Sequence, residues 1–180
     1  MKRIILLLTL TLASLCSQAQ LASVVTDKAN EAMEKYIPFV IVDTKTQMVL
    51  AKEPVKYNPE MEMPTCYFST VLPSETGITS TGDRRLLAIN ALPVVDGQRW
   101  VINQNRSTGE TIFSRRKFLG EHRAQYLWVP IVRGDYVYFL SLEGSLNINW
   151  GGFLCINEDG SFRSVKTIEE ASEWKIIYAK

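Results

Sequence analysis

Short apolar segments recur at regular intervals from about residue 36 to the end of the chain. Near the C-terminus, Trp174, Ile176 and Tyr178 are separated by single residues, so one face of an extended segment is apolar. This period of two residues is typical of β-strands. Asp, Asn, Gly and Pro, which favour tight turns, separate the apolar segments. The pattern predicts an all-β domain over residues 36–180.

One order of elements recurs three times in this domain. Each copy opens with an apolar strand and an Asx residue, followed by a polar turn and a second strand; the Asx residues are Asp43, Asn105 and Asn157. Each copy then reaches a third strand that carries an aromatic side chain; these are Phe68, Trp128 and Trp174. Fourth strands are expected at 84–90 and 136–142, and the third copy ends before a fourth.

Three units of about four strands, each with an aromatic third strand, resemble the β-trefoil and in particular the ricin-type lectin-like repeats. The resemblance covers roughly 36–180, although the Gln-x-Trp signature of those lectins is absent. It implies a closed barrel of three four-strand units. The alternative fold is another closed barrel of the lipocalin type.

The first residues predict export from the cytoplasm. Lys2 and Arg3 precede a short apolar core, and Ser17-Gln18-Ala19 has the form of a cleavage site, so 1–19 reads as a signal peptide of bacterial character. A lipoprotein anchored through Cys16 is the alternative. Residues 20–35 have helical spacing of apolar positions and predict a short amphipathic helix. We therefore expect a secreted or periplasmic protein.

Charge and composition exclude some partners. The chain has a formal net charge of +1, and without Lys2 and Arg3 this becomes −1. Nucleic-acid binding requires a basic excess, so no nucleic acid is expected. No segment after the signal is long and apolar enough to span a membrane.

Two cysteines, Cys66 and Cys155, follow the signal. An even pair in an exported protein is compatible with a disulfide. Both also stand among apolar neighbours, where a free thiol behaves as a small hydrophobic group. The sequence leaves both readings open, and no Cys or His spacing suits a metal.

The sequence contains no convincing catalytic motif. His122 is the only histidine and stands in a polar segment. The carboxylate pairs Glu60/Glu62 and Glu169/Glu170 are each close in sequence, which is more typical of solvated charge than of acid–base catalysis. We therefore expect a protein that is not an enzyme and that needs no cofactor or metal.

A candidate ligand site lies at Asn147, Asn149 and Trp150, followed by two glycines. An aromatic ring stacks on the apolar face of a sugar while amides bond its hydroxyl groups. In ricin-type lectins an early Asp of each unit contacts the ligand, and the resemblance assigns this role to Asp43. The expected function is a non-catalytic binding module for carbohydrate.

Two other functions compete with this one. Arg84-Arg85 stands at the start of a predicted strand, next to a loop, and some β-trefoil proteins inhibit proteases through a loop residue, so a protein-binding module is the alternative. A structural surface protein without a small ligand is the third possibility. Arg133-Gly134-Asp135 spells an adhesion tripeptide, but its position between two strands predicts a hairpin turn.

Overall fold

The computed structural model describes residues 37–71, 86–95, 98–105, 107–115, 123–146 and 151–179. The predicted signal peptide at 1–19 and the predicted helix in 20–35 lie outside these residues. The elements in the described part are β1 (Phe39–Asp43), β2 (Cys66–Val71), β3 (Leu86–Val95), β4 (Gln98–Gln104), β5 (Thr111–Arg115), the 3₁₀ helix η2 (Arg123–Tyr126), β6 (Trp128–Arg133), β7 (Tyr136–Ser141), α4 (Leu142–Leu146), β8 (Phe153–Ile156), β9 (Phe162–Val165) and β10 (Trp174–Tyr178).

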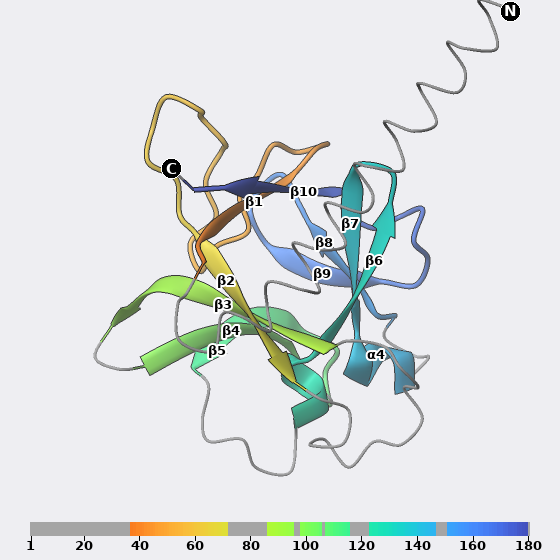
Figure 1. Ribbon diagram of the computed structural model, residues 1–180. Coiled ribbons are helices and arrows are strands. Elements are labelled where there is room, and N and C mark those ends of the chain that lie inside the picture. Colours follow the sequence, from red (N-terminus) through yellow and green to blue (C-terminus); the bar gives the residue numbers. More distant parts are fainter. Residues whose placement is uncertain are drawn as a thin grey trace, which may run out of the picture.

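Six strands form a closed antiparallel barrel (Figure 1). β1 pairs with β2, β2 with β3, β3 with β6, β6 with β7, and β7 with β10, which pairs back with β1. The prediction of an all-β closed barrel is confirmed. The barrel has six strands, and not the eight of the lipocalin-type alternative.

Alternation along the barrel strands fills the interior. Every second residue of each strand points inward, as the pleat of a β-strand requires. The largest inward side chains with no more than 4 % exposure are Phe39, Ile41, Phe68, Leu87, Ile89, Trp128, Phe139 and Trp174. The indole Nε1 of Trp128 donates to the carbonyl of Ile102 at 3.1 Å, so this buried polar group is satisfied.

Three hairpins lie outside the barrel and add apolar side chains to the same core. β4 pairs with β5, β8 pairs with β9, and residues 47–50 pair more irregularly with 55–57. The core residues that these hairpins supply are Met48, Leu50, Ile102, Phe113, Leu154 and Ile156.

The hairpins also touch one another in pairs. The rings of Phe113 and Phe162 lie 5.8 Å apart, edge to face, and join the second hairpin to the third. Gly160 joins the third hairpin to the first, because a Cβ at this position would lie 3.2 Å from Met48 and from Pro54. Gly160 also has a positive φ of 84°, which suits glycine.

The outer face of β1 is buried as well. Val40 and Val42 point away from the barrel interior and pack with Val49 under the segment that follows. This explains why all five residues of β1 are buried and why its sequence is an unbroken apolar run up to Asp43.

The predicted equivalence of Asp43, Asn105 and Asn157 does not agree with the strand pairing. Asp43 ends a barrel strand, whereas Asn105 and Asn157 follow the first strands of two hairpins. An apolar strand followed by an Asx turn occurs in both settings, so the sequence pattern alone does not separate them. The third copy was expected to end before a fourth strand. Its last strand, β10, is nevertheless paired within the barrel, because it forms five residue pairs with β1.

β3 continues to Val95 with an irregular register against β4. After β9, Ala171 N donates to Ile168 O in a hydrogen-bonded turn. One predicted strand end needs correction: the strand expected to continue to Leu142 ends at Ser141, and α4 begins at Leu142. In contrast, Gly134-Asp135 forms the predicted two-residue hairpin turn, with Arg133 paired to Tyr136.

Cys66 and Cys155 are free and buried. Burial raises the pKa of the Cys66 thiol from its ordinary value of 9.0 to about 12. Within the described residues, no helix has the length and apolar character needed to cross a membrane.

The raised pKa of Cys66 predicts a loss of stability at high pH. As the pH rises, the unfolded chain releases the Cys66 thiol proton before the folded protein does. The contribution of this thiol to the unfolding free energy is therefore intact below pH 9 and declines between pH 9 and 12. Over that range the unfolding free energy of the wild type should fall more steeply than that of Cys66→Ala, by up to about 1.4 kcal/mol per pH unit. Denaturant titrations at several pH values test this, and equal slopes would contradict it.

Candidate functional site

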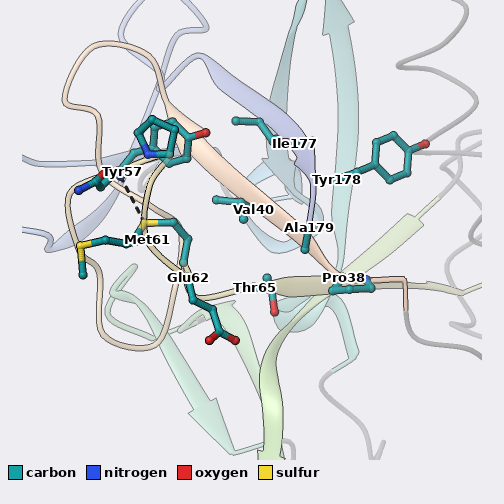
Figure 2. Close-up of a pocket in the computed structure, with 12 residues that line it drawn as sticks. Pro38, Val40, Tyr57, Met61, Glu62, Thr65, Ile177, Tyr178 and Ala179 are labelled. Carbon is teal, nitrogen blue, oxygen red and sulfur yellow. Dashed lines mark hydrogen bonds between the residues drawn. The ribbon is translucent and has the colours of Figure 1, made fainter.

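A pocket of about 460 Å³ lies between the outer face of β1 and β10 and the segment 57–65 (Figure 2). Its floor is the cross-strand pair Val40 and Ile177. Its lining residues are Pro38, Val40, Tyr57, Asn58, Pro59, Met61, Glu62, Met63, Thr65, Ile177, Tyr178 and Ala179. The pocket therefore sits on the barrel wall.

Local turn chemistry gives the segment 57–65 its shape. Asn58 and Pro59 occupy the first two positions of a turn, where Asn and Pro are favoured. The side-chain Oδ1 of Asn58 accepts from Glu60 N at 2.9 Å, and its carbonyl accepts from Met61 N at 3.2 Å. Asn58 N in turn donates to the Met63 sulfur at 3.4 Å. These bonds fold the segment back over β1.

Apolar and polar groups are mixed in the pocket. Tyr57 and Met63 pack against the valines of β1, and Met61 is 63 % exposed. Glu62 carries the only ionisable acidic or basic side chain among the lining residues apart from the tyrosines. Figure 2 shows its carboxylate and the Thr65 hydroxyl pointing to the same side. A ligand here would meet an apolar surface, one ring and a few hydrogen-bonding groups.

Tyr178 contributes less to the pocket than its position suggests. Figure 2 shows its ring pointing away from Tyr57 and Met61. The ring packs on Phe39 with a centroid distance of 5.2 Å. Tyr57 is therefore the aromatic ring on the ligand side.

Of the predicted site residues, Asp43 lies in the described part of the chain and Asn147, Asn149 and Trp150 lie outside it. The structure thus does not place these three relative to Asp43. The glycine after Trp150 has a packing role: Gly151 has a φ of 72°, and its carbonyl accepts from Gln104 Nε2 at 2.9 Å. A Cβ on Gly151 would lie 2.6 Å from the carbonyl of Val165.

Asp43 is 1 % exposed and organises the turn after β1. Its Oδ2 accepts from Thr46 N at 2.8 Å and from Thr46 Oγ1 at 2.7 Å. Its Oδ1 is buried without a hydrogen-bond partner. The carboxylate thus has an evident structural role in the turn.

A second polar group lies next to this turn. Glu173 accepts from Thr44 Oγ1 at 3.3 Å and from the Tyr138 hydroxyl at 3.4 Å. Burial and the neighbouring Glu173 carboxylate both raise the pKa of Tyr138 above its ordinary value. These contacts tie the turn after β1 to β7 and to the residue before β10.

The other residues singled out from the sequence divide into two sets. His122 and Arg84-Arg85 lie outside the described residues. Glu169 is exposed and lies 3.8 Å from Arg133, while Glu62 lines the pocket and Glu60 does not. Among the described residues, no three His, Cys, Asp or Glu side chains gather as metal ligands would.

None of the candidate ligand residues chosen from the sequence lies in the segment 57–65, so the pocket was missed. One signal was available: a tyrosine, two prolines and two methionines within a short connection are more apolar than a solvated loop needs. Compared with protein-family models and with curated proteins, the chain matches no family and no curated protein.

Replacing Asp43 should destabilise the protein through the turn. Asp43→Ala removes Oδ2, which accepts both hydrogen bonds from Thr46, and should lower the unfolding free energy by about 1–3 kcal/mol. Asp43→Asn keeps an oxygen acceptor and should cost less. Denaturant titration at neutral pH measures both, and an alanine variant as stable as the wild type would contradict the assigned role.

Proposed function

We propose that this protein is a non-catalytic binding module for carbohydrate, and that the pocket under 57–65 is its ligand site. The observation that carries the proposal is the mixture of one aromatic ring, aliphatic walls and hydrogen-bonding groups around about 460 Å³. Sugars present apolar C–H faces together with hydroxyl groups, so they need both kinds of surface. Export to the periplasm or the outside remains part of this proposal, on the predicted signal at 1–19.

We also propose that the barrel and hairpins together form a β-trefoil. In chain order, a barrel strand, a hairpin and a second barrel strand follow one another three times: β1 to β2, β3 to β6, and β7 to β10. Pairwise contacts between neighbouring hairpins support an approximate threefold arrangement. Each unit begins with a barrel strand in this proposal. The second and third units therefore begin one strand earlier than the units predicted from Asn105 and Asn157.

Two places compete for the ligand, the pocket and the Asn147/Asn149/Trp150 segment. We favour the pocket because Tyr57 provides a ring and Asn58, Glu62 and Thr65 provide hydrogen-bonding groups around one space. Asp43 is engaged in its turn and is almost fully buried, so we place it in the scaffold in this proposal.

A glycan array followed by calorimetry on the best ligand tests the proposal. Glu62→Gln should weaken binding by about 10-fold or more, since a hydrogen bond to a charged group contributes about 1.5–3 kcal/mol. Glu60→Gln is the matched control, because Glu60 is exposed in the same segment and does not line the pocket. It should bind as the wild type does.

Other outcomes would reassign or reject the function. Loss of binding with Trp150→Ala and not with Glu62→Gln would move the site to the 147–150 segment. Absence of binding to any glycan would reject the carbohydrate proposal. Inhibition of a trypsin-like protease that disappears with Arg85→Ala would instead favour the protein-binding alternative.

A further inference from the structure

Two cationic side chains converge on one indole ring at the junction of the first and second hairpins. Lys52 comes from the connection between residues 47–50 and 55–57, and its Nζ lies 4.3 Å from the centroid of the Trp100 ring. Arg115 is the cross-strand partner of Trp100 in the β4–β5 hairpin, and its Cζ lies 5.5 Å from the same ring. None of the three residues lines the pocket.

The indole ring of Trp100 explains why the Lys52 and Arg115 side chains lie close to the same place. The face of an indole is electron-rich and attracts ammonium and guanidinium groups within about 6 Å. Trp100 is half-buried and packs against the core, so the position of the ring is fixed. The lysine and the arginine repel each other, and the shared ring offsets part of this repulsion.

No anionic partner neutralises the pair within the described residues. Neither the Lys52 ammonium nor the Arg115 guanidinium forms an ion pair or side-chain hydrogen bond with a residue that the structure describes. Both side chains are exposed, so a ligand in solution has access to them. The chain as a whole carries a formal net charge of only +1, so this positive charge is local.

We infer that Lys52, Trp100 and Arg115 form a binding site for a sulfate or phosphate oxyanion. The guanidinium of Arg115 offers paired N–H donors that match two oxygens of such a group, and the Lys52 ammonium supplies a second charge. Trp100 acts as a positioning residue that holds both cations on one ring. The oxyanion is either a free ion or an ester on a saccharide, and the test separates the two.

A purely structural role for the three residues gives a different expectation. A cation–π contact that only joins two hairpins would change stability equally in any salt. A binding site adds a stabilisation that appears with sulfate and is absent with chloride, because a ligand that binds the folded state raises its stability by mass action. Sulfate also stabilises proteins in general through exclusion from their surface, so a control variant is necessary.

The test measures the affinity for sodium sulfate and sodium phosphate by calorimetry, and the shift in unfolding temperature relative to sodium chloride at equal ionic strength. Lys52→Gln and Arg115→Gln should each weaken binding by about 10-fold and remove the sulfate-specific part of the shift. Lys45→Gln, which removes an exposed lysine from the turn after β1, should leave both unchanged. Lys52→Arg keeps the charge and should retain binding.

Two further arms complete the test. Trp100→Leu should weaken binding of the oxyanion, because the two cations no longer share a ring. The loss of affinity should exceed what the lower stability of this variant in chloride explains. A sulfated saccharide that binds more tightly than sulfate and than its unsulfated form identifies an ester ligand; equal binding of sulfate and the sulfated saccharide identifies a free ion. If wild type, Lys52→Gln and Lys45→Gln respond alike to sulfate, the inference is wrong, whatever the glycan array shows for the pocket.

Discussion

The pairing of β1 with β10 is the constraint on which the rest of the fold depends. It joins the first and last described strands over five residue pairs, from Phe39 opposite Tyr178 to Asp43 opposite Trp174. Without this pairing the barrel would be an open sheet with two unpaired edges, which is a common site of aggregation. Closure also brings Phe39, Ile41 and Trp174 into one interior.

The same pair of strands creates the surface on which the pocket forms. A strand in a closed barrel has an inner and an outer face, and the apolar outer residues of β1 need a cover. The segment 57–65 supplies that cover through Tyr57 and Met63 but leaves about 460 Å³ beside Val40 and Ile177. The pocket thus follows from an incomplete match between an apolar strand face and the loop above it.

Much of the strand content could be predicted from the sequence, because alternation and turn residues are local signals. The ten strands in the described part of the chain overlap strands expected from the sequence, and the Gly134-Asp135 hairpin is formed as expected. The pairing order could not be predicted in the same way. Barrel and hairpin strands have similar patterns, and their difference depends on which distant strand each one meets.

The candidate site was less accessible to sequence reasoning for the same reason. Asp43 was expected to contact a ligand because the resemblance to ricin-type lectins assigns this role to an early Asp, and the structure adds a local role, since its Oδ2 accepts from Thr46, three residues away. The pocket combines residues 38–40, 57–65 and 177–179, which no local pattern links. Free, buried cysteines likewise depend on a distance between strands that spacing in the chain does not give.

The connection between β1 and β2 is where the proposed activities concentrate. The hairpins β4–β5 and β8–β9 pair over most of their length, whereas residues 47–57 pair only through isolated bridges and a few hydrogen bonds. Side chains of an irregular connection are less constrained by cross-strand neighbours, so they can point to other parts of the surface. Lys52 lies over the ring of Trp100, and Glu62 lines the pocket. Opposite charges on one connection would then direct two chemically different groups, an oxyanion and a hydroxyl-rich ligand, to separate places on the same barrel.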